Sequence, residues 1–161
     1  MLQKEDGTYM AESLDIVRYL DHLGTPMFDN AIDLRIDTWV KDAWPVALKL
    51  VIPRFTKGDF AELATPEARE AYRLREEKAF GDLEALTADT ATLLAEIASR
   101  MEALASILQD RDKVDMNDII LWPVLRSLSI VEGLNFPPSV RAYTEAISVR
   151  TDVPLLFNQA R

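Results

Sequence analysis

The chain begins with one β-hairpin signal, and nothing after it supplies a sheet for that hairpin to join. Asp6-Gly7 lies between two short runs, residues 2–5 and 8–10, and both turn residues tolerate the positive φ of tight hairpins. A two-stranded hairpin is marginally stable in water by itself. Every segment after Ala11 has the pattern of a helix or a loop. We therefore expect a mainly α chain that starts inside a sheet whose other strands are not encoded here, as in a fragment or a protomer that borrows strands.

Turn-forming residues divide the chain near its start. A short amphipathic helix is predicted over 13–22, and Gly24 follows it as a terminator. The next residues include Asp29-Asn30 and have the composition of a linker. We place a domain boundary there, which gives a small unit at 1–24 and an all-helical domain at 25–161.

The second unit carries five further helical patterns. Apolar spacing and helix breakers predict helices over about 31–50, 66–86, 91–108, 114–132 and 139–150. Thr65-Pro66 is a strong start signal, with Thr as N-cap and Pro at the first helical position. Pro53 is expected to end the first of the five helices, because proline removes an amide donor from a helix interior.

The helix predicted over 114–132 has the most informative start. Asp115 is placed as N-cap and Asp118 three residues later, a capping box with Asp in place of the usual Glu. Val114 before the cap and Ile119 inside the helix are placed to form a hydrophobic staple. The residues that follow are apolar nearly all round, which is typical of a central, buried helix. Water cannot reach the first amides of such a helix, so internal caps must satisfy them.

The charge balance excludes several function classes. Lys and Arg number 18 against 27 Asp and Glu, so the formal net charge is −9. A nucleic-acid partner or a polybasic membrane contact requires the opposite excess. The sequence contains no apolar run long enough to span a bilayer, and its polar, acidic first residues are not a signal peptide. A cytoplasmic protein is the expectation.

The inventory of chemically active side chains is short. The chain contains no cysteine, which excludes disulfides, thiolate metal sites and thiol nucleophiles from these residues. The one histidine, His22, lies nine helical positions from Ser13, about 13.5 Å along the axis, so a local Ser-His pair is excluded. Asp33 and Asp37 share a helix face but lack further ligands, so we expect no metal site and assign them to a helix start.

Glu12-Ser13 is the strongest candidate binding motif. The pair stands where the second strand turns into a helix, so the Ser hydroxyl and the free first-turn amides can receive a carboxylate. The adjacent carboxylate can accept from an ammonium group. The motif therefore suits the α-amino-acid end of a small molecule. The alternative is that Ser13 only caps its own helix.

Several segments resemble one known family. Residues 1–17, MLQKEDGTYMAESLDIV, closely resemble the end of the thioredoxin-like domain in bacterial two-domain glutaredoxins of the glutaredoxin-2 type. These proteins share the fold of glutathione S-transferases. The resemblance continues through 50–55 (LVIPRF), 65–69 (TPEAR) and 118–126 (DIILWPVLR). It covers essentially the whole chain, including the all-helical glutathione S-transferase-like domain with its capped buried helix.

The resemblance implies a glutathione-dependent disulfide oxidoreductase whose partners are glutathione and protein disulfides. The family's Glu-Ser pair holds the γ-glutamyl end of glutathione and falls on Glu12 and Ser13 here, which favours the ligand interpretation of that motif. The family's Cys-Pro-Tyr-Cys motif and its cis-proline would precede Met1. We therefore expect a glutaredoxin lacking its catalytic N-terminal portion, with no catalytic residue of its own and inactive alone.

Two alternatives remain open. Helical domains of the glutathione S-transferase type are similar to domains that serve as non-catalytic assembly platforms. An apolar surface exposed where a sheet should pack would favour such an interaction module, with self-association through that surface. A transferase that activates the glutathione thiol is the weaker alternative, because the tyrosine or serine that it would use also falls outside these residues.

Overall fold

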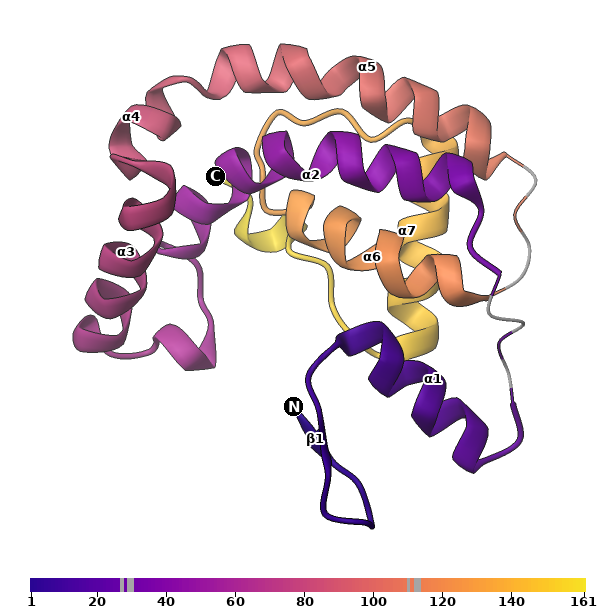
Figure 1. Ribbon diagram of the computed structural model, residues 1–161. Helices are drawn as coiled ribbons and strands as arrows, with labels where there is room; N and C mark the ends of the chain where they lie inside the picture. The colour runs from indigo at the N-terminus through magenta and orange to yellow at the C-terminus, as the bar shows by residue number, and fades with distance from the viewer. Residues whose placement is uncertain (27, 29–30, 110, 112–113) are drawn as a thin grey trace.

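The protein is a bundle of helices with a small hairpin at one side (Figure 1). The computed structural model describes residues 1–26, 28, 31–109, 111 and 114–161. Asp29 and Asn30 of the predicted linker lie outside these residues. The elements are β1 (Leu2–Gln3), β2 (Tyr9–Met10), α1 (Ser13–Leu23), α2 (Leu34–Phe55), the 3-10 helix η1 (Ala61–Leu63), α3 (Pro66–Phe80), α4 (Leu83–Ala88), α5 (Thr90–Leu108), α6 (Met116–Leu128), α7 (Pro138–Thr151) and the 3-10 helix η2 (Phe157–Gln159).

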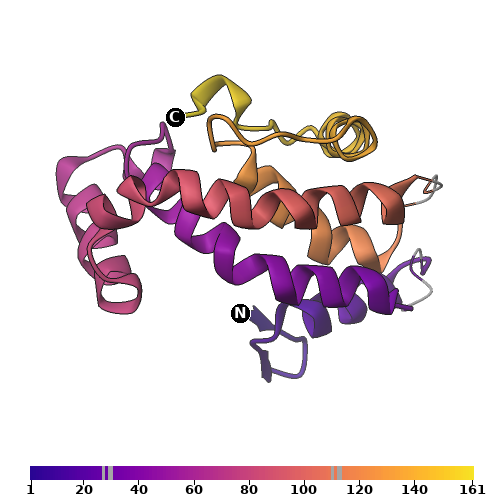
Figure 2. The ribbon, with the colours of Figure 1, turned by 90° about the horizontal axis from the view of Figure 1, so that it is seen from above.

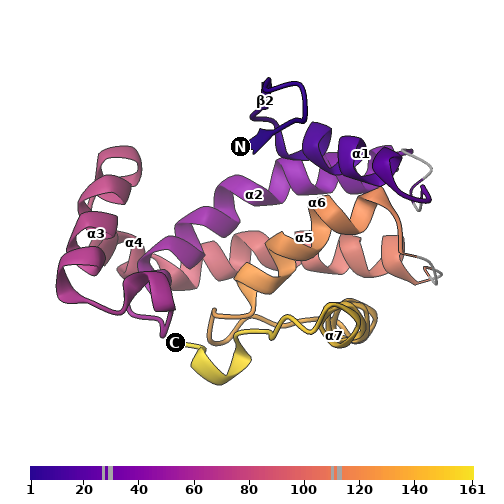
Figure 3. The ribbon, with the colours of Figure 1, turned by 90° about the horizontal axis from the view of Figure 1, so that it is seen from below.

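Helices α2, α5 and α6 form the centre of the bundle. Helices α2 and α5 lie side by side along the molecule, α6 packs against α2, and α3 with α4 extends from one end (Figures 1 and 2). Helix α7 lies on one side of this layer, and the hairpin with α1 lies on the other (Figure 3). The core consists of apolar side chains from all three central helices and α7, including Ile36, Leu50, Ile97, Leu104, Leu121, Leu125 and Val140. The predicted mainly α fold is confirmed.

The predicted hairpin is present, but its turn differs from the prediction. The Lys4 amide donates to the Thr8 carbonyl at 2.8 Å, and the Gly7 amide donates to the Lys4 carbonyl at 3.0 Å. The loop therefore has three residues, 5–7, and not the two of Asp6-Gly7 alone. Gly7 has φ 82°, the left-handed conformation that closes such a three-residue loop with a bulge.

Two helix ends differ from the sequence expectation, and side-chain hydrogen bonds hold both of them. Helix α2 continues through Pro53 to Phe55. The Arg54 guanidinium stabilises this last turn, since its Nη1 donates to the Leu50 carbonyl at 2.6 Å while its Nη2 reaches Thr90 Oγ1 at 3.0 Å. Helix α6 ends at Leu128 and not at 132, and the Ser129 hydroxyl closes it with a 2.6 Å hydrogen bond to the Arg126 carbonyl.

The single helix predicted over 66–86 is two helices. Thr65 caps α3 as expected, because its Oγ1 accepts from the Ala68 amide at 3.2 Å. The helix stops at Gly81, whose φ of 77° is not helical. Asp82 then starts α4 by accepting from the Glu84 amide at 2.8 Å.

The start of α6 has both hydrogen bonds of a capping box. Asp115 is the N-cap and accepts from the Asn117 amide at 2.8 Å, while Asp118 Oδ2 accepts from the Asp115 amide at 2.7 Å. Val114 and Ile119, the two staple residues, both line one groove between α6 and α7. Burial by itself would raise the pKa of the Asp115 carboxyl. Hydrogen bonds from Arg111 and Asn117 outweigh it and hold that pKa below its ordinary value.

The buried Asp118 carboxylate connects the start of α6 to two further parts of the chain. Its Oδ1 accepts from Arg111 Nη2 at 3.1 Å and from the Tyr143 hydroxyl of α7. Burial and the adjacent Asp118 carboxylate raise the pKa of Tyr143, so its hydroxyl stays a donor at neutral pH. The neighbouring Asn117 Oδ1 accepts from the Asp33 amide at 2.7 Å, which ties the start of α2 to α6.

We predict that Asp118→Ala destabilises the fold by about 3 to 5 kcal/mol, the range for removing one partner of a buried charged network. The substitution leaves the Asp115 amide, the Arg111 guanidinium and the Tyr143 hydroxyl without their shared acceptor. Urea unfolding followed by circular dichroism measures the loss.

Asp82→Ala is the matched control for that measurement. It removes another aspartate N-cap, but one at the exposed start of α4, so a loss of about 1 kcal/mol is expected. Equal losses for the two variants would contradict the central role of Asp118.

Candidate functional site

The first candidate site is the start of α1, where the hairpin turns into the helix. Strand β2 ends at Met10, and Glu12 is the N-cap of α1 with extended backbone angles, φ −74° and ψ 122°. Ser13 is the first helical residue. Both Glu12 and Ser13 are exposed to solvent. The hairpin thus presents the two residues side by side at the positive end of a helix dipole.

The polar groups at this helix start have no partner among the described residues. Glu12 makes no side-chain cap hydrogen bond, and the first bond along the helix runs from the Ile16 amide to the Glu12 carbonyl at 3.0 Å. The amides of residues 13–15 therefore have no acceptor within the helix, and the Ser13 hydroxyl has no hydrogen-bond partner among the described residues. Glu12 holds the N-cap position of α1, and Ser13 lies one residue inside the helix.

The two carboxylates nearest this helix start differ in whether they form an ion pair. The Glu12 carboxylate has no ion-pair partner among the described residues, whereas the Asp15 carboxylate pairs with Arg18 at 3.1 Å. A ligand with an adjacent carboxylate and ammonium would find donors from the amides and Ser13 and an acceptor from Glu12. The geometry can therefore hold an α-amino-acid group and, by itself, offers no nucleophile stronger than a serine hydroxyl.

The other sequence candidates are structural. His22 lies in the last turn of α1, with its Nδ1 2.9 Å from the Arg18 carbonyl oxygen. Asp33 caps α2 and accepts from the Arg35 amide at 2.8 Å, and the Asp37 carboxylate pairs with Lys41 at 2.7 Å. In the described ranges, no group of three or more His, Cys, Asp or Glu side chains could hold a metal ion. Nor does any helix in those ranges have the length and apolarity needed to cross a membrane.

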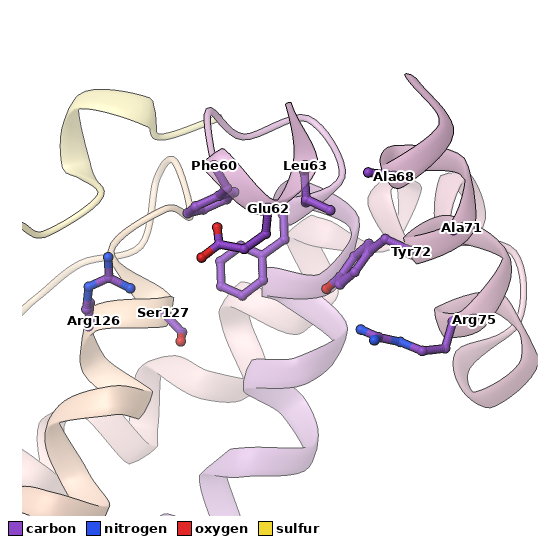
Figure 4. A pocket seen from close by; sticks show the side chains of 10 residues that line it. Phe60, Glu62, Leu63, Ala68, Ala71, Tyr72, Arg75, Arg126 and Ser127 are labelled. Carbon is purple, nitrogen blue, oxygen red and sulfur yellow. The ribbon is translucent and has the colours of Figure 1, made fainter. Parts of the chain in front are cut away.

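A second candidate site is a cavity between α3 and α6, which was not predicted from the sequence. Its volume is about 620 Å³. It is lined by Phe55, Phe60, Glu62, Leu63, Ala68, Ala71, Tyr72, Arg75, Arg126 and Ser127 (Figure 4). Four of these residues recur on α3 at intervals of three and four, which marks one helix face. That spacing is the available signal in the sequence, but the mixed charges of α3 are typical of a solvated surface helix and obscure it.

Comparison with known proteins gives one consistent answer. Residues 35–160 match the family of the glutaredoxin 2 C-terminal domain. Glutaredoxin 2 of Escherichia coli K12 is 34% identical over 165 residues, which cover 99% of this chain and 77% of that protein. Glutaredoxin 2 of Escherichia coli O157:H7 shows the same identity and coverage.

A solved structure extends the similarity to the fold. The crystal structure of glutaredoxin 2 from Salmonella typhimurium in complex with glutathione superposes with a TM-score of 0.89 at 30% identity. The match covers 99% of this chain and 75% of that one, so it includes the hairpin and α1 as well as the helical part. The sequence and the fold agree, and the chain belongs to the glutaredoxin 2 family.

Proposed function

We propose that this chain provides the γ-glutamyl half of a glutathione site, formed by Glu12 and Ser13, within a glutathione-dependent disulfide oxidoreductase. The observation that carries the proposal is the start of α1, whose first amides and Ser13 hydroxyl have no partner among the described residues. The related glutaredoxin 2 of Salmonella typhimurium supports it, since that protein forms a complex with glutathione.

The chemistry of the ligand fits the two side chains. The γ-glutamyl end of glutathione carries one α-carboxylate and one α-ammonium group. The carboxylate would receive hydrogen bonds from the Ser13 hydroxyl and the first amides of α1, and the Glu12 carboxylate would accept from the ammonium. These residues bind and orient the tripeptide and take no part in bond making.

The 161 residues of the sequence contain no cysteine, so they supply no reactive thiol themselves. In a glutaredoxin, a thiolate attacks the mixed disulfide between glutathione and a protein, forms a new disulfide and releases the protein thiol. We therefore propose that these residues alone orient glutathione, and that protein disulfides are the substrates of the complete site. We also propose a domain division at 24/25, with a thioredoxin-like segment before it.

Glutathione titration followed by ¹H–¹⁵N NMR tests the proposed site. We expect shifts centred on the amides of residues 12–15. Ser13→Ala should weaken binding roughly five- to tenfold, since it removes a hydrogen bond to a charged group. Glu12→Gln should weaken it about two- to fivefold, because an exposed ion pair contributes less.

Thr65→Ala is the control for that titration. It removes a hydroxyl from the start of α3, a helix that the proposal does not use, and should leave glutathione binding unchanged. Shifts scattered over the surface, or equal losses in Ser13→Ala and Thr65→Ala, would refute the assignment.

A glutathione-coupled assay with a small disulfide tests the proposed lack of thiol chemistry. We predict no reduction above the uncatalysed rate by the 161-residue chain, because no thiolate is available in it. Turnover that disappears when the chain is removed by immunodepletion would overturn this prediction.

A second function, self-association, is favoured by the apolar groups that α1 and the hairpin leave exposed. Leu20 and Leu23 are 50% and 64% exposed and follow Ile16 on one face of α1, at the spacing of a packing stripe. Tyr9 of β2 is 64% exposed. We propose that a second copy of the chain can pack on this surface.

Sedimentation velocity tests self-association. We expect a concentration-dependent dimer for the unaltered chain and a monomer for Leu20→Lys/Leu23→Lys, since two charges on the stripe oppose burial. Leu34→Lys, at a 77% exposed leucine of α2, should leave the dimer intact. A monomer for the unaltered chain at all concentrations would refute the proposal.

A further inference from the structure

The cavity between α3, η1 and α6 has the walls of a ligand site and no role in the function proposed above. Its volume of about 620 Å³ is in the range of small-molecule pockets. Phe55 and Phe60 meet edge to face in its lining, with ring centroids 5.3 Å apart. Tyr72 and Leu63 extend this apolar surface, so the cavity presents several flat or branched groups to a ligand (Figure 4).

The polar groups of this lining include two guanidinium groups. Arg75 and Arg126 approach from opposite walls, and Glu62 is the one acidic residue among the described residues that line the cavity (Figure 4). The Arg75 guanidinium lies 5.0 Å from the centroid of the Tyr72 ring and pairs with the Glu76 carboxylate at 2.6 Å, so its charge is already partly balanced. Arg126 donates its Nε to the Pro154 carbonyl at 3.0 Å, and no carboxylate of the described residues lies within ion-pair distance of it.

Tyr72 adds a neutral donor between the charged groups. Burial, reinforced by the Glu76 carboxylate, raises the pKa of Tyr72 to about 12, so its hydroxyl keeps its proton at neutral pH. The cavity therefore combines an aromatic lining with two guanidinium groups and a phenol hydroxyl.

We propose that this cavity binds an organic anion with a flat aromatic body, independently of glutathione. The aromatic rings and Leu63 would cover the apolar body, and Arg126 would face the anionic group with Arg75 on the other wall. An inorganic anion would leave the apolar lining exposed to water. A neutral hydrocarbon would leave Arg126 without a counter-charge. The overall charge of −9 opposes anions, so selectivity for one must arise locally, from Arg126, which has no ion-pair partner among the described residues.

Two fluorescent probes of similar shape separate the apolar and the charged contributions. The probe 8-anilinonaphthalene-1-sulfonate carries a sulfonate, and N-phenyl-1-naphthylamine has the same rings without it. We expect saturable binding of the anionic probe at one site, at least tenfold tighter than binding of the neutral probe. Equal affinities, or no saturable binding, would overturn the proposal.

Substitutions then locate the binding site. Ala71→Trp should fill the cavity and weaken both probes at least tenfold. Arg126→Gln should weaken the anionic probe about fivefold and leave the neutral probe unchanged. A merely structural role of Arg126 would weaken both probes equally. Arg73→Gln is the control on the same helix, because Arg73 pairs with Glu70 and Glu77 and does not line the cavity.

The remaining outcomes are also decisive. Anionic-probe binding that survives Ala71→Trp but is lost in Leu20→Lys/Leu23→Lys would place the probe on α1 and refute the cavity. If circular dichroism shows that Ala71→Trp does not fold, the difference between the two probes in Arg126→Gln decides the question. Ala71→Trp and Arg126→Gln leave Glu12 and Ser13 unchanged, so a failure of the cavity proposal does not affect the glutathione proposal.

Discussion

The buried carboxylate of Asp118 is the interaction on which the arrangement of the bundle depends. It accepts from the Asp115 amide, from Arg111 and from the Tyr143 hydroxyl, so the start of α6, the preceding segment and α7 meet at one group. The adjacent Asn117 adds the start of α2 through the Asp33 amide. An apolar helix in the middle of a bundle could slide or rotate at little cost. A satisfied polar network at its first turn fixes its register, because any displacement would leave several buried groups unpaired.

The same network fixes the position of the C-terminal end of α6. Arg126 lies eight residues beyond Asp118, about 12 Å along the helix axis, and forms one wall of the cavity with Ser127. Helix α2, which is tied to the same network at its start, brings Phe55 to the cavity from its last turn. Buried polar bonds at one end of the bundle thus determine which side chains face each other at the other end. In the same way, Arg54 holds the last turn of α2 through the Leu50 carbonyl and Thr90, so the cavity wall does not depend on helix propensity alone.

Structural features that depend on adjacent residues could be predicted from the sequence. Features that depend on contacts between distant residues could not. Thr65 and Asp115 cap their helices as expected, because each cap needs only the next three residues. Pro53 does not end α2, and the turn beyond it is held by bonds from the Arg54 side chain to the Leu50 carbonyl and to Thr90 on α5. Leu34 fits an apolar helical stripe and yet is 77% exposed, because burial depends on the neighbour that covers a face. The cavity combines α2, η1, α3 and α6, and no single segment carries enough of it to be seen.

The candidate glutathione residues differ from the cavity in how the fold positions them. Helix α1 has no buried residue, so local geometry, and not a packed core, sets the directions of Glu12 and Ser13. In water the first amides of α1 are solvated, and a ligand carboxylate gains only the difference between its own hydrogen bonds and those of the displaced water. Part of that gain is lost in ordering a weakly packed unit. It follows that α1 should bind the γ-glutamyl group weakly when its free face is bare, and more tightly when packing on Leu20 and Leu23 holds the helix in place.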